Sequence, residues 1–425
     1  MFEKYDAYKD SELPSFGSVP IHWEIVPLCS ITTLKSITNV VNEELLSVYL
    51  DKGVIRFDDV TEKRTNVTSL DLSKYQLVEE GDFVLNNQQA WRGSVGVSIY
   101  RGIVSPAYLV LKLSPKVDAK FANYFFRNSA MVSQYLINSK GVGTIQRNLY
   151  WQHLKRSDVV LPPREEQIEI AEFLNQKTAE IDQAIAIKEQ QIALLNERKQ
   201  IVIQKAVTQG LDPNVTMKDS GVEWIGEIPE HWEVRANRTI FKERNEQGKE
   251  GLLLLSVSIH SGVSNEEISE EENVRGRIKI EDKSKYILVK QGDIAFNMMR
   301  AWQGGIGAVS VDGMVSPAYI VAKPNKLMNS EFFEYQYRCP EFIQQMDRYS
   351  KGITDFRKRL YWDGFKQLMT IVPPIDEQQE IIYYIKKLDE QIAFAIDVKK
   401  QQIEKLKEYK TTLINDAITG KIKVV

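Results

Sequence analysis

An α+β fold with two similar mixed domains and two long helices is expected for this chain of 425 residues. Three features indicate it: a set of motifs that occurs twice, short alternating apolar segments broken by Gly and Asn, and two long segments that lack both Gly and Pro. Hydrophobic residues make up 43% and charged residues 27% of the chain, which suits globular domains with sizeable cores.

A long internal repeat organises the chain. The shift in numbering that carries Ser105-Pro106-Ala107-Tyr108 onto Ser316-Pro317-Ala318-Tyr319 recurs at several other motifs. These are Gly81-Asp82 with Gly292-Asp293, Ala90-Trp91 with Ala301-Trp302, Ser139-Lys140-Gly141 with Ser350-Lys351-Gly352, and Leu149-Tyr150-Trp151 with Leu360-Tyr361-Trp362. A solenoid has shorter and more numerous units, so the repeat predicts two similar domains related by a pseudo-two-fold axis.

The first part of each copy, residues 1–161 and 211–372, is expected to mix strands and helices. Residues 95–110 and 306–321 alternate as strands do, around predicted turns at Gly102 and Gly313. Residues 124–136 and 332–346 have helical spacing, and each is predicted to be one helix. The order of the strands stays open.

The second part of each copy, residues 162–210 and 373–425, is predicted to be one long helix and, in the second copy, a tail. Two prolines followed by acids stand where each helix would begin, and Gly210 and Gly420 stand where each would end. A segment of about 44 residues makes a helix of roughly 65 Å.

Apolar residues on both long segments follow a heptad-like seam interrupted by lysine at matching places, Lys188 and Lys199 in the first and Lys399 and Lys410 in the second. The seam residues are Ile181, Ile185, Ile192, Leu195, Val202 and Ala206, and then Ile392, Ile396, Ile403, Leu406, Leu413 and Ala417. The shared pattern predicts that the helices pack on each other as a coiled coil. The alternative is that each helix buries its stripe on its own domain.

Charge and cysteine content exclude several classes of protein. The net charge is −3, so a nucleic-acid site would have to be a local patch. Two cysteines, Cys29 and Cys339, make neither a disulfide framework nor a four-ligand zinc site. The charged N-terminus and the short apolar runs predict a cytoplasmic protein without a membrane partner.

Several motifs resemble the specificity subunit of type I restriction–modification enzymes, and the resemblance covers nearly the whole chain. They are Gly143-Thr144-Ile145-Gln146-Arg147-Asn148-Leu149, Leu161-Pro162-Pro163-Arg164-Glu165-Glu166-Gln167 with its second copy Val372-Pro373-Pro374-Ile375-Asp376-Glu377-Gln378, and Ser220-Gly221-Val222-Glu223-Trp224-Ile225-Gly226. Each motif alone is weak, and their order, spacing and duplication make the signal specific.

The resemblance implies a non-catalytic subunit that binds one bipartite, asymmetric site on double-stranded DNA. Residues 1–161 and 211–372 would be target-recognition domains, one for each half-site. The long helices would form an antiparallel coiled coil that sets the spacer. Two modification subunits, which bind S-adenosylmethionine and methylate adenine, would dock on this chain, which itself holds no cofactor. Restriction subunits, which are ATP-driven translocases with a nuclease, are the optional further members.

Positions where the two copies differ in polar residues are the candidates for DNA contact. Asn and Gln suit adenine and Arg suits guanine, so changing side chains on a constant frame are what two half-sites require. The candidates in the first copy are Asn87, Gln88, Gln89, Arg92, Thr144, Gln146, Arg147 and Asn148. Those in the second copy are Arg300, Gln303, Arg357, Lys358 and Arg359, and Lys351 is a candidate because it lies in a basic cluster with the last three. Arg348 adds to this basic cluster, which contains one acid, Asp355. The alternative is that all of these are solvated loop residues.

A tryptophan position and a histidine position recur in both copies. Trp91 and Trp302 are predicted to be core residues, with stacking on a base or sugar as the alternative. His22 and His231 are predicted to buttress the start of each domain. His153 and His260 are not repeated, so the sequence offers no duplicated set of metal ligands.

Three other functions are alternatives to the one that the resemblance implies. Ser-Pro-Ala-Tyr is close to the signature of amino-methyltransferases, but Ala107 and Ala318 depart from it and no glycine-rich turn for S-adenosylmethionine is present. A coiled-coil scaffold without DNA specificity would lack the amide-rich and basic positions above. A specificity subunit of another restriction class with the same plan would have the same sequence features.

Overall fold

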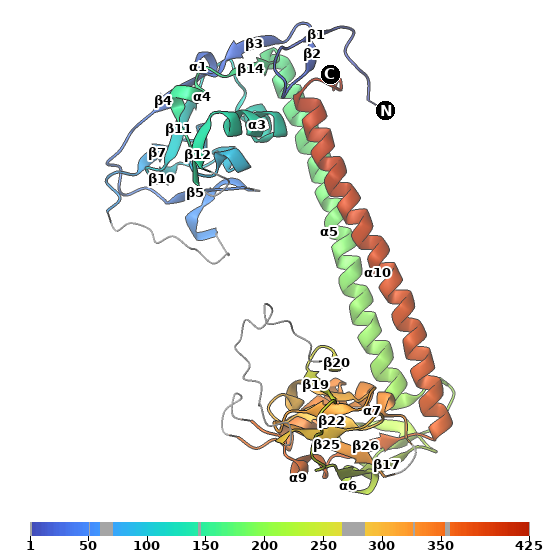
Figure 1. Ribbon diagram of the computed structural model, residues 1–425. Helices are drawn as coiled ribbons and strands as arrows, with labels where there is room; N and C mark the ends of the chain where they lie inside the picture. Colours follow the sequence, from blue (N-terminus) through green and yellow to red (C-terminus); the bar gives the residue numbers. More distant parts are fainter. Residues whose placement is uncertain are drawn as a thin grey trace. The chain divides into compact units, whose positions relative to one another are not determined.

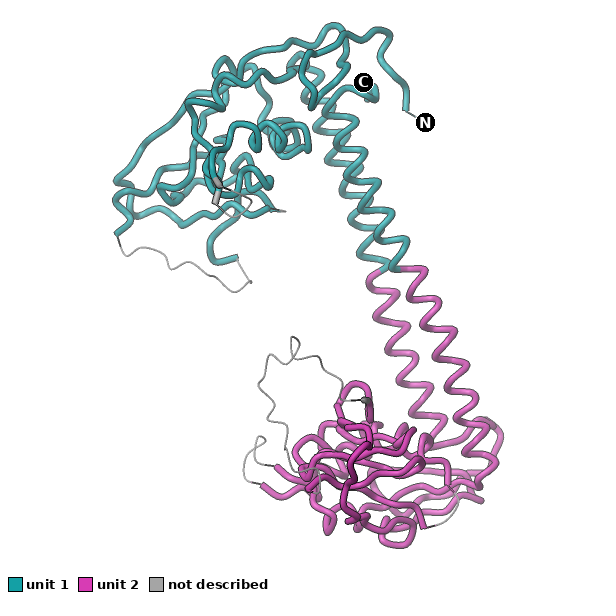
Figure 2. Tube along the Cα trace, in the orientation of Figure 1, with its two compact units in different colours: residues 1–188, 400–425 teal, residues 189–399 magenta. Residues whose placement is uncertain are grey.

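The computed structural model describes residues 2–50, 52–59, 71–142, 146–265, 285–325, 328–352 and 358–424. It mixes helices and strands, which confirms the predicted α+β class (Figure 1). The chain forms two compact units (Figure 2). Unit 1 comprises Met1–Lys188 and Lys400–Val425, and unit 2 comprises Glu189–Lys399. Each long helix therefore contributes to both units.

Unit 1 is built around a four-stranded antiparallel sheet in the order β4-β11-β8-β9. Its strands are β4 (Thr32–Lys35), β8 (Phe83–Asn86), β9 (Val95–Val97) and β11 (Tyr108–Leu113). Successive side chains of a strand point to opposite faces, so Phe83 and Leu85 of β8 enter one apolar cluster and Val84 enters another. The sheet is consequently covered on both faces, as the uninterrupted burial of Phe83 to Leu85 requires.

Smaller strand pairs surround this sheet. The further strands of unit 1 are β1 (Tyr8–Asp10), β2 (Ser18–Pro20), β3 (Glu24–Pro27), β5 (Leu46–Tyr49), β6 (Gly53–Arg56), β7 (Gln76–Val78), β10 (Gly102–Val104), β12 (Ser139–Val142), β13 (Gln146–Leu149) and β14 (Asp158–Leu161). The pairs β1–β2, β3–β14, β5–β6, β7–β10 and β12–β13 are all antiparallel. Short helices are α1 (Leu28–Ile31), α4 (Trp151–Leu154) and the 3-10 turns η1 (Phe57–Asp59) and η2 (Ala90–Arg92).

The predicted single helices at 124–136 and 332–346 are wrong, because each is a pair of helices. In unit 1 these are α2 (Ala119–Arg127) and α3 (Ser129–Ile137). Asn128 between them has extended backbone, and its side chain accepts a hydrogen bond from the Met131 amide. Asparagine caps a new helix more readily than it continues an old one. In unit 2, Pro340 opens the second helix after a break at Cys339.

The predicted turns at Gly102 and Gly313 are also wrong, because both glycines begin a strand. The missing side chain matters here for space. A Cβ on Gly102 would lie 2.5 Å from the carbonyl oxygen of Glu44, and one on Gly313 would lie 2.8 Å from that of Leu253. These glycines let two backbone segments approach closely. A glycine needed for close approach looks the same in the sequence as a glycine needed for a turn.

Unit 2 has a four-stranded antiparallel sheet with the equivalent order β18-β25-β22-β23. A second sheet, β20-β19-β24-β21, contains the one parallel pair among its strands, β19 with β24. The strands are β15 (Met217–Asp219), β16 (Glu227–Pro229), β17 (Glu233–Ala236), β18 (Phe241–Glu243), β19 (Leu253–Ser258), β20 (Gly262–Asn265), β21 (Ile287–Val289), β22 (Ile294–Asn297), β23 (Ile306–Ala308), β24 (Gly313–Val315), β25 (Tyr319–Pro324) and β26 (Met369–Val372). The shorter helices are α6 (Asn237–Ile240), η4 (Ala301–Gln303), α7 (Ser330–Tyr337), α8 (Pro340–Arg348) and α9 (Trp362–Phe365).

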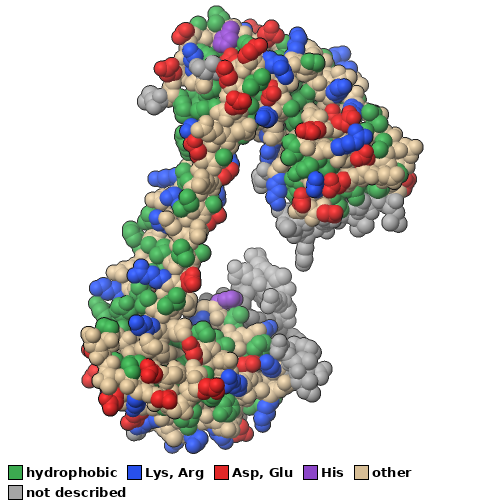
Figure 3. Space-filling view, turned by 180° about the vertical axis from the view of Figure 1, so that it is seen from behind, with side chains coloured by type: hydrophobic (Ala, Val, Ile, Leu, Met, Phe, Trp, Pro, Cys, Tyr) green, Lys and Arg blue, Asp and Glu red, His purple; other side chains and the backbone are tan. Residues whose placement is uncertain are grey.

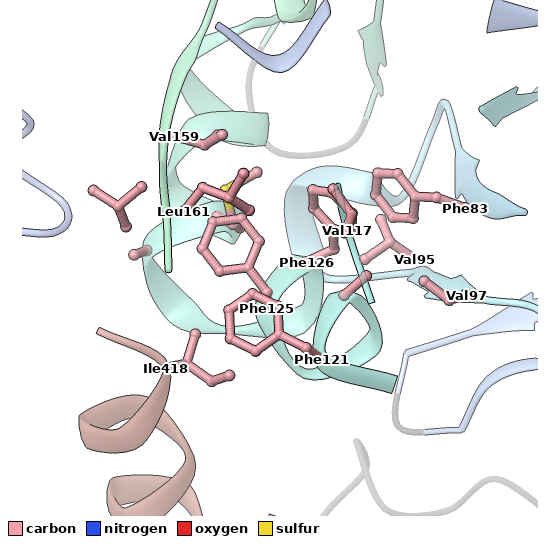
Figure 4. Packing of buried hydrophobic residues seen from close by; sticks show 14 of the residues in the cluster. Phe83, Val95, Val97, Val117, Phe121, Phe125, Phe126, Val159, Leu161 and Ile418 are labelled. Atoms are coloured by element: carbon pink, nitrogen blue, oxygen red, sulfur yellow. The ribbon is translucent and has the colours of Figure 1, made fainter. Parts of the chain in front are cut away.

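Two long helices complete the fold, α5 (Arg164–Gln209) and α10 (Ile375–Ile418). Gly210, directly after α5, has a φ of 81°, the left-handed conformation that suits a residue ending a helix. In unit 1, the end of α10 enters the main core, where Ile418 lies in one cluster with Phe121 and Phe125 of α2 (Figure 4). In unit 2, the start of α10 and the end of α5 enter the other large cluster through residues such as Ile385 and Val207.

The surface carries mixed charge. On the face drawn in Figure 3, basic and acidic side chains are interspersed over both units, in keeping with the net charge of −3. In the described part of the chain, no helix combines the length and the apolar character needed to cross a membrane.

Candidate nucleic-acid interface

A tight turn after the central strand β8 presents the first group of candidate residues. Asn86 ends the strand, and its side-chain oxygen accepts a hydrogen bond from the Gln88 amide at 3.0 Å. Its carbonyl accepts from the Gln89 amide at 3.0 Å. Asn297 does the same after β22 in unit 2, where Met299 donates to its side chain at 2.9 Å. Asparagine favours such local turns, so the same frame carries different side chains in the two units.

The hairpin β12–β13 meets this turn in unit 1. The Leu149 amide at the end of β13 donates to the Asn87 carbonyl at 2.9 Å, and the Asn87 amide donates to the Ala107 carbonyl at 3.2 Å. Ala107 belongs to the repeated Ser-Pro-Ala-Tyr motif. In unit 2, Leu360 donates to Met298 at 2.9 Å and Met298 to Ala318 at 3.2 Å. Two segments about 60 residues apart in sequence thus become neighbours through backbone bonds.

The candidate residues of unit 1 lie on these two segments. Gln88, Arg92 and Asn148 are exposed, whereas Asn87, Gln89 and Arg147 are half-buried. Gln146 begins β13, and Thr144 lies outside the described residues. The structure therefore brings the 87–92 and 146–148 candidates together on one part of unit 1.

The candidate residues of unit 2 form the equivalent group. Arg300 and Lys351 are exposed, and Gln303, Lys358 and Arg359 are half-buried. The Arg300 guanidinium donates to Gln303 Oε1 at 2.8 Å. Lys351 and Arg359 face each other in a short antiparallel bridge, with amide-to-carbonyl distances of 2.8 and 2.9 Å. Arg357 and Asp355 lie outside the described residues.

Charge at this place in unit 2 differs from the predicted cluster in two respects. Lys358 Nζ forms an ion pair with Asp347 Oδ1 at 2.7 Å, so an acid from α8 joins the group. Arg348 contacts a ring, because its guanidinium carbon lies 4.8 Å from the centre of the Trp224 ring. Trp224 is part of the Ser-Gly-Val-Glu-Trp-Ile-Gly motif, and stacking with Arg348 gives that motif a structural role in unit 2.

The prediction that Trp91 and Trp302 are core residues is wrong. Both side chains are half-buried, Trp91 in the turn that follows β8 and Trp302 in the turn that follows β22. These two turns carry the candidates for DNA contact and are called the recognition turns below. Trp91 Nε1 donates to the Gln88 carbonyl at 2.9 Å and Trp302 Nε1 to the Met299 carbonyl at 3.0 Å. The repeated Ala-Trp pair suggested burial. In the structure each indole is bonded to the backbone of its own turn and is only half-buried.

The repeated His-Trp-Glu and Pro-Pro motifs join each domain to its long helix. Glu166, in the first turn of α5, accepts hydrogen bonds from Trp23 Nε1 at 3.0 Å and from Tyr5 Oη at 2.5 Å, and it lies 2.8 Å from His22 Nε2. Burial, together with the bond to Glu166, holds the pKa of Tyr5 far above its ordinary value. These contacts agree with the predicted buttress role of His22.

The same joint recurs in unit 2, where the structure describes the histidine and tryptophan contacts of Glu377. Glu377 Oε2 accepts from Trp232 Nε1 at 2.8 Å, and Glu377 Oε1 lies 2.5 Å from His231 Nε2. The neighbouring glutamines are buried, and Gln167 and Gln378 each donate to a proline carbonyl at 2.8 Å, from Pro162 and Pro373 respectively. The motif that resembles the family thus anchors the helix and lies apart from the recognition turn in sequence and in contacts.

The seam residues of the long helices are buried or half-buried in both units. Ile181, Ile392, Ile403 and Leu413 are buried, whereas Ile185, Ile192, Leu195, Val202, Ile396 and Leu406 are half-buried. Within unit 1, Lys410 Nζ contacts both carboxylate oxygens of Asp182 at 2.7 Å, and Lys188 donates to Gln402 at 2.8 Å. Within unit 2, Lys199 pairs with Asp389 at 2.8 Å. Three of the four lysines that interrupt the seam, Lys188, Lys199 and Lys410, therefore contact the other helix.

Sequence reasoning missed several residues of this interface. Asn86 and Asn297, which hold the turns, and Tyr150 and Tyr361, which are 50% and 48% exposed after the hairpin, were not singled out. A buried ion pair at the start of the same strand, Asp82 with Lys35 before β8 and Asp293 with Arg244 before β22, was missed as well. The repeat itself was the available signal, because all the pairs except the two basic residues recur at the same shift.

Comparison with known proteins gives similarity to one family. Residues 20–197 match the family described as "Type I restriction modification DNA specificity domain". The chain is 25% identical to the putative type I restriction enzyme MjaX specificity subunit of Methanocaldococcus jannaschii, with 100% of this chain and 98% of that protein covered. The chain is similar to type I restriction–modification specificity subunits over nearly its whole length. The resemblance found in the sequence is thereby confirmed.

Another specificity subunit and two solved structures match over a similar extent. The EcoKI specificity subunit of Escherichia coli K12 is 22% identical, over 91% of this chain and 86% of its own. The crystal structure of the HsdS subunit from Thermoanaerobacter tengcongensis matches with a TM-score of 0.54 at 13% identity, over 95% of this chain and 98% of that one. A chain solved to explain complex assembly and conformational transition of the type I R-M system matches with a TM-score of 0.62 at 12% identity, over 94% and 98%. These two structures support the fold.

Proposed function

We propose that this chain is the sequence-specific DNA-binding subunit of a type I restriction–modification complex, with one half of a bipartite site contacted by each unit. Specificity subunits are non-catalytic members of such complexes, and they bind DNA and assemble with modification and restriction subunits. One observation carries the proposal for this chain: each unit has the same turn-and-hairpin frame, and the polar side chains on that frame differ between units.

Base chemistry fits this division. The described side chains on the unit 1 frame include the amides Asn87, Gln88, Gln89 and Asn148, whose donor and acceptor groups suit adenine. The equivalent region of unit 2 offers Arg300, Lys351, Lys358 and Arg359, and arginine suits guanine. The proposal therefore has the two units contact half-sites of different sequence from the major groove.

Helix pairing supports a spacer role for α5 and α10. Ion pairs between the helices within each unit, such as Asp182 with Lys410, and the burial of the seam support an antiparallel coiled coil. In this proposal the paired helices hold the half-sites at a fixed separation, which a flexible linker would not do. The proposed boundaries are residues 1–161 and 211–372 for the recognition domains and 162–210 and 373–425 for the helical parts.

Large apolar side chains on the outer faces of the long helices support docking of modification subunits. Leu194 and Ile201 of α5 are 54% and 57% exposed, and Tyr383 and Phe394 of α10 are each 72% exposed. Large exposed apolar groups mark protein interfaces. The proposal includes two modification subunits, which supply S-adenosylmethionine and the adenine methyltransfer, and restriction subunits in complexes that also cleave DNA.

Methylome sequencing of a host that expresses this chain with its modification partner tests the function. We expect methylated adenines in one motif with two specified halves separated by an unspecified spacer of fixed length. A motif without a spacer, or methylation without sequence preference, would contradict the proposal. The purified chain alone should neither bind S-adenosylmethionine nor methylate DNA, and either activity would favour a methyltransferase instead.

A heptad insertion tests the spacer role. Seven residues inserted after Gln191 in α5, with a matching heptad after Lys399 in α10, keep the seam in register and lengthen both helices by about 10 Å. The preferred spacer should lengthen while both halves of the motif stay the same. The control carries the same seven residues in the segment between α5 and β15, after Pro213, and should keep the original spacer. An unchanged spacer in the helix variant would refute the role.

A further inference from the structure

Each recognition turn holds a basic group over an indole ring. In unit 1, the Arg92 guanidinium carbon lies 4.6 Å from the centre of the Trp91 ring. In unit 2, Lys358 Nζ lies 5.2 Å from the centre of the Trp302 ring. Each indole N–H is already bonded to a backbone carbonyl of its own turn. The ring orientation is thus fixed, and a cation on its face is held in place.

The basic group comes from a different part of the chain in each unit. Arg92 follows Trp91 directly, but the residue that follows Trp302 is Gln303, which is neutral. Lys358 reaches the Trp302 ring from the hairpin segment instead, and it also pairs with Asp347. The positive charge on the ring is therefore kept although its place in the sequence changes.

This pattern separates two kinds of DNA contact. Neighbouring side chains on the turn change from Gln88 and Gln89 to Met299 and Arg300, as contacts to different bases require. A phosphate is the same at every sequence, so a contact to it has no reason to differ between half-sites. A charge retained at one place among varying neighbours has the property expected of a phosphate contact.

We propose that the Trp91–Arg92 and Trp302–Lys358 pairs each bind a phosphate of the DNA backbone and position the turn on the duplex without regard to sequence. The proposal rests on the DNA-binding function proposed above. The tryptophan is a positioning residue in it, because it holds the cation, and Arg92 and Lys358 make the contact. The variable side chains beside them remain the candidates for base recognition.

Salt dependence of DNA binding distinguishes these roles. Each phosphate contact contributes about 0.9 to the slope of log affinity against log salt concentration. We expect Lys358→Gln to lower that slope by about one and to weaken binding to all duplexes alike. The measurement is fluorescence anisotropy of the chain in complex with its modification subunits, over a potassium chloride series. The probes are the duplex that carries the methylome motif, duplexes with single changes in each half, and an unrelated duplex.

Moving the cation provides the sharpest control. Lys358→Arg should keep the slope of the natural protein. In the double variant Gln303→Arg with Lys358→Gln, the charge stands where unit 1 carries it, and the slope should be restored. Gln303→Arg alone is the matched control, because Gln303 also accepts a hydrogen bond from Arg300. Arg92→Gln tests the same claim in unit 1 should Lys358→Gln fail to fold by circular dichroism.

Two results would overturn the inference. An unchanged slope in both Lys358→Gln and Arg92→Gln removes the phosphate contact. A loss confined to duplexes in which the half-site of the substituted unit is intact, with no loss on duplexes altered in that half-site, assigns these residues to base recognition. If the natural complex binds the motif and the unrelated duplex equally, the proposed sequence specificity fails instead, and the slopes still test the phosphate contact.

Discussion

Replacing Glu166 with alanine removes the acceptor at the joint between the first domain and α5. Three groups lose their partner: Trp23 Nε1, Tyr5 Oη and His22 Nε2. They differ in access to water. Trp23 is fully buried, Tyr5 is half-buried, and the His22 side chain is 45% exposed. Only a group that water cannot reach incurs the full cost of a lost partner.

The expected loss follows from that ranking. An unsatisfied buried donor costs about 1–3 kcal/mol, so the Trp23 N–H dominates. The half-buried Tyr5 hydroxyl adds to it, and His22 adds little because water replaces the carboxylate. We expect Glu166→Ala to lower the free energy of unfolding by about 2–4 kcal/mol.

Two matched variants separate this network from other roles of an acid. Glu165 shares the first turn of α5 but is exposed, and Glu165→Ala should cost less than about 1 kcal/mol, the size of a helix-dipole effect. Glu377→Ala in unit 2 should fall between the two, at about 1–2 kcal/mol. The Glu377 side chain is 34% exposed, and no equivalent of Tyr5 contacts it among the described residues.

Guanidinium unfolding of the purified chain measures these costs, and hydrogen exchange of peptides from each unit shows where protection is lost. A double-mutant cycle with Trp23→Phe tests the mechanism, because the double variant should lose clearly less than the sum of the single variants. Additive losses, or a Glu377→Ala cost above that of Glu166→Ala, would refute the reasoning.

Three further predictions follow from burial. Asp293→Ala removes the carboxylate that bonds the buried Arg244 guanidinium at 2.7 and 3.1 Å, and it should lower the free energy of unfolding by about 3–5 kcal/mol. In the same denaturation assay Glu246→Ala, which removes the exposed partner of Arg244, should cost less than about 1 kcal/mol. Leu413 on the seam is 3% exposed, and Leu413→Ala should lower the free energy of unfolding by about 2–5 kcal/mol. Leu194 is 54% exposed, and Leu194→Ala should cost about 0.5 kcal/mol or less. Similar losses for the two variants in thermal unfolding would contradict the assignment of Leu413 to a buried seam. Burial raises the pKa of the Cys339 thiol to about 12. At pH 8 a thiol reagent should therefore react only with the exposed Cys29 in the folded protein and with both cysteines in guanidinium. Fast reaction of two thiols in the folded protein would disprove this prediction.

Long-range pairing explains why parts of the site escaped the sequence. Positions 87–89 and 146–148 were each identified as variable between copies, but nothing local shows that Leu149 bonds to Asn87. The ion pair of Lys358 with Asp347 and the stacking of Arg348 on Trp224 likewise join distant segments. A charge count along the sequence therefore does not show which of these basic residues has an acidic or aromatic partner.

Helix breaks show the same limit on a shorter scale. Residues 124–136 have helical apolar spacing throughout, and the periodicity hides the break because helices on both sides bury apolar faces in one core. Asn128 and Pro340 were the available signals, since both residue types favour the start of a helix.

Local chemistry alone accounts for the α+β class, the duplication of motifs, and the positions of α5 and α10, because proline, acids and glycine act on the few residues beside them. The residue types of the candidates for DNA contact can likewise be identified from the sequence, by comparing its two copies. Which of those candidates share one surface, which charges are neutralised by a neighbour, and which tryptophans remain accessible depend on the folded chain. Those properties arise from contacts between segments far apart in sequence, and such contacts exist only once the sheets and the core have formed.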